Sequence, residues 1–303
     1  MTTADIATLA PKHAPVRTYL ERPSKPALRL PPGACDSHVH VFGPADRFPY
    51  APDRPSTPIE APKEALFALH RHLGISRCVI VQSVAHGMDN RVVADAIAAG
   101  GGRYLGVALV RTDIGNAELQ ALANSGFRGV RFNFMRHIAA SADIAAVLAL
   151  TPRLAQVGMH LQVHFESALV HELGPQLARS AVPVVIDHMG RVDAREGAAH
   201  HDYVALLRLL ESPLFRVKVS GIDRIDAQLG AADGYDAGIA LARDLVARFP
   251  ERCLWGTDWP HPNHTHIPDD GVLVDALARI APAPALLEQL LVRNPAEFYR
   301  FDA

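Results

Sequence analysis

The feature that most constrains the fold of this chain is a regular alternation, from Ala34 onwards, of short apolar runs with longer amphipathic stretches. Short strands separated by helical patterns are typical of repeated βα units, in which helices connect parallel strands. The pattern predicts eight strands, at residues 34–41, 77–84, 103–110, 127–134, 159–165, 182–187, 214–219 and 252–257. Because eight such units close on themselves, we predict a (β/α)8 TIM-type barrel, an α/β fold.

Each predicted strand is followed by a stretch with helical periodicity, which supplies the crossover that parallel strands need. These stretches lie at residues 63–74, 90–99, 116–124, 142–157, 167–179, 201–211, 236–248 and 271–280. The strands themselves are nearly continuously apolar, as in the run from Cys78 to Val81. Such strands are buried on both faces, whereas a sheet with one face in water would alternate apolar and polar residues.

Three segments fall outside the minimal barrel. Residues 1–33 carry several prolines without helical periodicity and predict an extended N-terminal arm, which leaves 34–303 as a single barrel domain. Residues 43–62 are also rich in proline and predict a stiff loop at the barrel mouth, and whether this loop closes over the site stays open. Residues 284–300 predict an extra C-terminal helix with one apolar stripe.

Composition excludes several classes of partner. The chain has 303 residues, 49% of them hydrophobic, as in ordinary globular proteins, and its formal net charge of −2 lacks the basic field typical of nucleic-acid binding. No run of eighteen apolar residues and no signal-like segment near the N-terminus is present, so we expect a cytoplasmic protein without membrane contact. Cys35, Cys78 and Cys253 lie in separate apolar runs, which favours reduced thiols over a disulfide framework.

Five residues of metal-ligand type stand at the ends of predicted strands. His38 and His40 end the first strand, and because side chains alternate along a strand, both point to the same face. His164 ends the fifth strand, His188 the sixth and Asp258 the eighth. Barrel active sites lie at the C-terminal ends of the strands, so these residues predict one shared site. Imidazoles with one carboxylate suit a divalent metal, above all Zn²⁺ with an open position for water.

Four arginines lie near the same strand ends. Arg128 and Arg131 flank the end of the fourth strand, Arg191 follows His188, and Arg224 follows the seventh strand. The guanidinium group offers a planar fork of donors that matches carboxylates and keeps its charge at working pH. Most arginines are solvated surface residues, but four near these strand ends predict a local positive pocket for a substrate with carboxylate or sulfonate groups.

Two further histidines are weaker candidates for polarising a substrate. His86 ends the second predicted strand, and His261 follows Asp258 by three residues. The sequence has no Gly-x-Ser-x-Gly nucleophile motif and no P-loop. The glycines at 100–102 precede a predicted strand instead of following one, which argues against a dinucleotide-binding turn.

The motifs around these residues resemble the amidohydrolase superfamily and, more narrowly, its branch of pyrone-dicarboxylate and related lactonases. They are Asp36-Ser-His38-Val-His40, Ile186-Asp-His188-Met-Gly190-Arg191 and Trp255-Gly-Thr-Asp258-Trp-Pro260-His261-Pro262. The resemblance runs from about Pro31 to Tyr299. It implies the distorted TIM barrel of that superfamily, with His38, His40, His164 and His188 as metal ligands and Asp258 as both ligand and general base.

One departure from the branch concerns the metal. Pyrone-dicarboxylate lactonases carry tyrosine where this chain has His164 and can work without a metal, so the resemblance leaves metal-independent catalysis open. With His164, the ligand set of this chain resembles that of the metal-dependent members more closely. A second tyrosine of the branch corresponds to Ser56 here, which leaves the exact substrate open.

The resemblance implies metal-assisted ring opening of a small anionic lactone from the breakdown of aromatic compounds, such as 4-sulfomuconolactone or 2-pyrone-4,6-dicarboxylate. Hydroxide would attack the lactone carbonyl, Asp258 and His188 would move protons, and arginines would hold the anionic groups. A sugar-acid lactonase and a metal-dependent decarboxylase of the same superfamily are alternatives, and a binding barrel without catalysis is a third. The sequence leaves the oligomeric state open, including a homo-oligomer.

Overall fold

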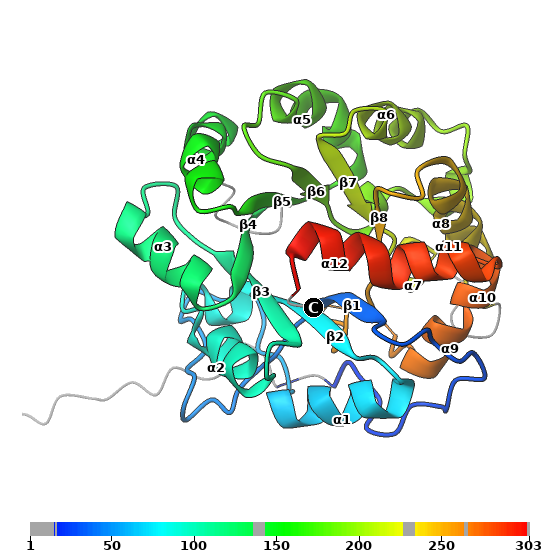
Figure 1. The fold of residues 1–303 in the computed structure, drawn as a ribbon, viewed down its shortest axis with the longest axis horizontal. Helices are drawn as coiled ribbons and strands as arrows, with labels where there is room; N and C mark the ends of the chain where they lie inside the picture. Colours follow the sequence, from blue (N-terminus) through cyan, green and yellow to red (C-terminus); the bar gives the residue numbers. More distant parts are fainter. Residues whose placement is uncertain (1–14, 16, 136–142, 227–233, 264–265, 302–303) are drawn as a thin grey trace, which may run out of the picture.

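The computed structural model describes residues 15, 17–135, 143–226, 234–263 and 266–301. Eight parallel strands follow one another around a barrel in chain order, and helices cover its outside (Figure 1). The strands are β1 (Cys35–Val39), β2 (Arg77–Val81), β3 (Tyr104–Leu109), β4 (Phe127–Phe134), β5 (His160–Phe165), β6 (Val184–Ile186), β7 (Phe215–Lys218) and β8 (Cys253–Leu254). All eight lie inside the predicted ranges, so the TIM-type barrel is confirmed.

Backbone hydrogen bonds between the chain after β8 and the chain of β1 close the barrel. Ser37 N donates to Trp255 O over 2.8 Å, Asp258 N donates to His38 O over 2.8 Å, and His40 N donates to Trp259 O over 2.7 Å. The approach is so close that a Cβ atom on Gly256 would lie 2.6 Å from His38 N, so only glycine fits there. This contact brings Asp258 beside the β1 histidines.

The outer helices also follow the predicted pattern. They are α1 (Lys63–Leu73), α2 (Arg91–Ala99), α3 (Asn116–Asn124), α4 (Ile144–Gln156), α5 (Val170–Leu177), α6 (His201–Leu210), α7 (Ile222–Ile225), α8 (Asp236–Arg248), α9 (Asp270–Asp275), α10 (Leu277–Ile280), α11 (Pro284–Glu288) and α12 (Asn294–Tyr299). The predicted helix at 271–280 is divided into α9 and α10. The C-terminal helix predicted at 284–300 is α11 and α12, joined by a π-helical turn at Gln289–Arg293.

The C-terminal helix closes the end of the barrel where the strands begin. Figure 1 shows α12 lying across this end, and Tyr299 is fully buried there in one apolar cluster with Cys35 and Val79. The end with the strand termini is therefore the one that can hold a site. Cys35, Cys78 and Cys253 are buried free thiols, and no described helix is long and apolar enough to cross a membrane.

The proline-rich segments lie on the barrel beside its mouth. In the arm, the Tyr19 hydroxyl donates to Glu60 O over 3.0 Å, and its ring lies 5.0 Å from that of Trp259. The loop after β1 is pinned at its base by an antiparallel bridge between Phe42 and Ala61.

Candidate active site

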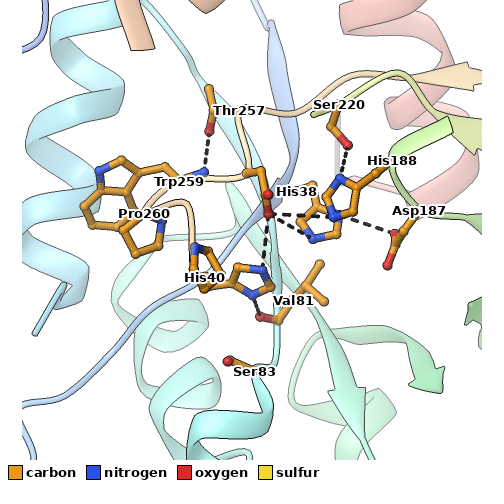
Figure 2. Close-up of polar contacts among 12 residues, drawn as sticks. His38, His40, Val81, Ser83, Asp187, His188, Ser220, Thr257, Trp259 and Pro260 are labelled. Atoms are coloured by element: carbon orange, nitrogen blue, oxygen red, sulfur yellow. Dashed lines mark hydrogen bonds and ion pairs between the residues drawn. The ribbon is translucent and has the colours of Figure 1, made fainter. Parts of the chain in front are cut away.

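The first pair of candidate residues, His38 and His40, comes from the end of β1, and both side chains are buried. His40 Nδ1 lies 2.7 Å from the carbonyl oxygen of Val81, so its N–H donates there. That Nε2 lies 3.4 Å from Asp258 Oδ1. Figure 2 shows His38, His40 and His188 gathered around one point.

His188 and Asp258 follow β6 and β8, and both have backbone conformations that non-glycine residues rarely adopt. Their φ angles are 48° and 66°. Strained backbone of this kind persists only where the surroundings enforce it, and it concentrates at functional sites. His188 Nδ1 hydrogen-bonds Ser220 Oγ over 2.9 Å, which leaves Nε2 facing Asp258 Oδ1 at 3.8 Å.

His38, His188 and Asp258 form a buried group that can hold a metal. Their ligand atoms all lie within 4.8 Å of one another. His38 Nε2 is 3.7 Å from Asp258 Oδ1 and has no hydrogen-bond partner among the described residues, as expected of a ligating atom. Burial, and then the charge of Lys218, lower the pKa of His38 to about 4, so its imidazole is neutral at pH 7. Two imidazoles and a carboxylate fit a divalent transition metal.

His164 ends β5 beside this group but outside it. Its Nδ1 lies 3.2 Å from Asn133 Oδ1, and its ring centroid lies 5.4 Å from that of His188. Its Nε2 is buried without a hydrogen-bond partner among the described residues. Burial, and then the nearby Arg131, hold the pKa of His164 well below its usual range, which keeps the ring neutral. That His164 ligates the metal therefore stays a prediction.

Below the histidines lies a buried ionic network that sequence reasoning missed. Lys218, at the end of β7, donates from Nζ to Gln162 Oε1 over 2.9 Å and lies 3.3 Å from His38 Nδ1. Asp187 Oδ1 lies 3.3 Å from the same His38 Nδ1. Burial lowers the pKa of Lys218 to about 8 despite the opposing charge of Asp187. A lysine that ends an apolar inward-facing strand was the only sequence signal for this network.

Three arginines line the wall of the site. Arg131 Nε donates to Asp187 Oδ2 over 2.8 Å, and Arg224 Nε donates to Asp258 Oδ2 over 3.1 Å. Burial, and then the like charge of Arg224, lower the pKa of Arg191 to about 10. This guanidinium remains charged at neutral pH. The lowered pKa shows that burial and the neighbouring positive charge both disfavour its charged form.

The three arginines share one cavity of about 200 Å³ at the barrel mouth with His40, His164 and His188. The described residues that line it are His40, Ser83, Val84, Arg131, Asn133, Met135, His164, His188, Arg191, Arg224, Asp258, Pro262 and Asn263. Ser56, in the loop after β1, lies with its Oγ 3.1 Å from Asn263 Oδ1, so this loop reaches the rim. The cavity suits a small ligand that carries more than one negative group.

The prediction that Arg128 helps to form this pocket is wrong. Arg128 stands at the start of β4, near the C-terminal helix, and its Nε donates to Tyr299 O over 3.1 Å. It lines a separate cavity with Arg216 and Arg300. Arg128 precedes Arg131 by only three positions, but along an extended strand that spacing moves a side chain about 10 Å towards the other end of the barrel.

His86 and His261 are also absent from the described cavity lining. His86 Nε2 accepts from Gly43 N over 3.3 Å, and its Nδ1 lies 3.1 Å from Pro49 O, so it holds the loop after β1. His261 is fully buried, with Nε2 3.1 Å from Asp270 Oδ1. The structure thus gives both histidines positions that hold loops, instead of the substrate contact that we predicted.

Known proteins resemble this chain over most of its length. Residues 35–301 match the amidohydrolase family. The chain is 43% identical to a 2-pyrone-4,6-dicarboxylate hydrolase of Comamonas testosteroni, over 93% of this chain and 94% of the relative. It is 35% identical to a 4-sulfomuconolactone hydrolase of Hydrogenophaga intermedia, over 89% of each chain. A solved structure of a putative 2-pyrone-4,6-dicarboxylic acid hydrolase from Pseudomonas putida is 32% identical, covers 91% of this chain and all of its own, and superposes with a TM-score of 0.77.

Proposed function

This chain belongs to the amidohydrolase family, and from that premise we propose that it opens the ring of a small anionic lactone by hydrolysis. The two similar relatives act on lactones that carry carboxylate or sulfonate groups, as their names state. The observation that carries the proposal is one cavity in which His188 and Asp258 lie beside Arg131, Arg191 and Arg224. The ester group of a bound lactone would thus contact His188 and Asp258, while its anionic substituents would contact the arginines of the same cavity.

The cavity wall binds and orients the substrate. Arg191 is the natural first partner for a carboxylate or sulfonate, because its charge is buried and crowded by Arg224. A charge-assisted bond to an anion would offset the free-energy cost of burying the Arg191 charge. It would also hold the lactone carbonyl at a fixed distance from the buried histidines and Asp258. We expect 2-pyrone-4,6-dicarboxylate and 4-sulfomuconolactone to fit, since both carry separate negative groups around a small ring.

Asp258 moves the proton. Burial alone would raise the pKa of this carboxyl, but Arg224 and His188 outweigh that effect and hold its pKa well below its usual range, so it is ionised. Arg224 fixes Oδ2, and Oδ1 faces the histidines, where an attacking water would sit. Asp258 would take a proton from this water and return it to the oxygen of the opened ring.

We expect the buried histidines and Asp258 to hold a single Zn²⁺ ion. Such an ion, when bound, lowers the pKa of a water ligand towards about 7 and polarises a carbonyl oxygen. His38 and His188 would be its ligands with Asp258, and His40 and His164 lie beside them to complete the set. The neutral rings of His38 and His188 and the fixed carboxylate of Asp258 are what this chain contributes.

A substrate screen tests the proposal. Loss of ring absorbance is followed for the two anionic lactones, release of acid is followed for a neutral sugar lactone, and the product mass is measured. We expect addition of one water to an anionic lactone. Loss of CO₂ would assign a decarboxylase instead, and faster turnover of the sugar lactone would overturn the choice of substrate class. Zinc analysis of the same sample, with and without a chelator, tests the metal separately.

A further inference from the structure

A second cluster of metal-ligand side chains lies on the outside of the barrel, between α5 and α6. These helices pack against each other, and Figure 1 shows them side by side. His171 is in the first turn of α5, while His201 and Asp202 begin α6. The ligand atoms of these three residues lie within 4.8 Å of one another, as in the buried group.

The cluster is arranged around one carboxylate oxygen. His171 Nε2 lies 2.9 Å and His201 Nε2 lies 3.2 Å from the same atom, Asp202 Oδ1. The two imidazole rings stack, with centroids 5.2 Å apart and an interplanar angle of 21°. Both histidines therefore direct the same nitrogen to one point from two different helices.

These distances are slightly shorter than those between neighbouring ligand atoms around a transition metal. Zn–N and Zn–O bonds are about 2.0–2.2 Å, so neighbouring ligand atoms of a tetrahedral site are about 3.3–3.5 Å apart. The two separations from Asp202 Oδ1 differ from this spacing by a few tenths of an ångström, which a small side-chain movement would supply. The ring protons that now face Asp202 would move to the Nδ1 atoms, and the Nε2 lone pairs would bind the ion.

The burial of the three side chains also suits a metal site. Asp202 is 5% exposed, whereas His171 and His201 are 46% and 71% exposed. Burial alone would raise the pKa of Asp202, but hydrogen bonds from Ser167 and His171 outweigh it and keep the carboxyl ionised. A fixed carboxylate with two open imidazoles leaves room for the ion to enter and for water to complete its coordination.

We propose that His171, His201 and Asp202 form a second site for a divalent transition metal such as Zn²⁺, which would tie α5 to α6. The two nitrogen ligands exclude Mg²⁺ and Ca²⁺, which prefer shells made of oxygen. The proposal does not depend on the function of the barrel mouth, because its residues are separate from that cavity.

Zinc stoichiometry tests the proposal. The wild type, the double variant His171→Ala/His201→Ala and the control His72→Ala are stripped with a chelator and dialysed against Zn²⁺ in excess Mg²⁺. His72 is a partly exposed histidine of α1 outside both clusters. We expect the double variant to bind one zinc per chain less than the wild type and the control. Equal zinc in all three proteins would overturn the site.

A second measurement covers the case in which the double variant is less stable. The single variant His201→Ala changes a side chain that is 71% exposed, so its fold should persist. We expect added Zn²⁺ to raise the melting temperature of the wild type more than that of this variant. His188→Asn changes only the buried group, so its melting temperature should still rise more with Zn²⁺ than that of His201→Ala. A zinc-dependent shift that is the same in His201→Ala and wild type would contradict the proposal.

Discussion

The floor and the arginine wall of the cavity are built on different principles. On the floor, His38, His40, His188 and Asp258 are fixed by hydrogen bonds to the backbone or to neighbours, and the Nε2 of His38, which faces Asp258, has no hydrogen-bond partner among the described residues. On the wall, two of the three arginines are already paired with carboxylates of the protein. The floor therefore keeps atoms ready for chemistry, whereas part of the wall serves to hold the floor in place.

This difference divides the arginines by role. Arg131 neutralises Asp187, which contacts His38, and Arg224 holds Asp258. Their removal would disturb the floor as well as the binding of anions. Arg191 lines the cavity without a salt bridge among those found in the described chain, so it is the arginine whose loss should affect substrate selectivity alone.

The largest expected effect separates the floor from the wall. Asp258→Asn keeps the shape of the side chain but removes its basicity, so kcat should fall by roughly 10²–10⁴ while the anionic substrate still binds. Steady-state kinetics and a binding titration with a slow substrate check this. The control is Asp113→Asn, which changes an exposed carboxylate that is not part of the described cavity lining. Turnover near that of the wild type would exclude Asp258 as the proton-transfer group.

The next prediction tests whether Arg131 acts mainly by supporting the residues of the floor. Arg131→Met leaves Asp187 as a buried carboxylate without its main partner, which should lower the free energy of unfolding by about 3–5 kcal/mol. Activity on anionic and neutral lactones should fall together. Urea denaturation measures the first effect and kcat/KM the second.

The matched control for Arg131 is Arg111→Met, which breaks a bond of similar length, 2.9 Å, to Asp113 at the exposed surface. Its stability should stay that of the wild type, because exposed ion pairs contribute little. If Arg131→Met loses activity only on anionic lactones and keeps its stability, Arg131 is a residue of the wall, as the sequence alone had suggested.

The sequence predicted the floor better than the wall for a physical reason. Parallel strands of a barrel all end at one rim, so His38, His188 and Asp258 can be brought together from chain order without any knowledge of contacts. The fold itself followed from the same periodicity, and the predicted strands and helices differ from the observed ones mainly at their ends.

The wall depends on register and on pairing, which periodicity does not report. Arg128 and Arg131 occupy the same strand, yet one contacts Tyr299 O at the closed end and the other contacts Asp187 beneath the site. Lys218 was missed because its partners, Gln162 and Asp187, lie far away in the sequence. A lysine at the end of a buried strand indicates that it needs partners, but it does not indicate which residues they are.

A smaller effect isolates selectivity. Arg191→Met should cost about 2–5 kcal/mol in kcat/KM on a lactone with two negative groups, because the substrate loses a charge-assisted pair in a buried setting. Turnover of a neutral lactone should stay the same or rise, since an uncompensated buried charge is removed. Comparison of kcat/KM on the two lactones measures the change. Equal losses on both would show that Arg191 supports the floor too.

The smallest effect concerns His164, which lies where the floor meets the wall. Its Nε2 is buried without a hydrogen-bond partner among the described residues, but its ring centroid is 5.4 Å from that of His188, outside the three-residue group. If it completes the metal ligands, His164→Tyr leaves the inner three in place and should weaken zinc binding by about tenfold, within the range for groups that support a metal site. His188→Asn, which removes an inner ligand, should lose the zinc of this buried group altogether. Zinc titration against a chromogenic chelator compares the two variants. Unchanged zinc affinity in His164→Tyr, together with a raised KM, would show that His164 contacts the substrate and does not bind the metal.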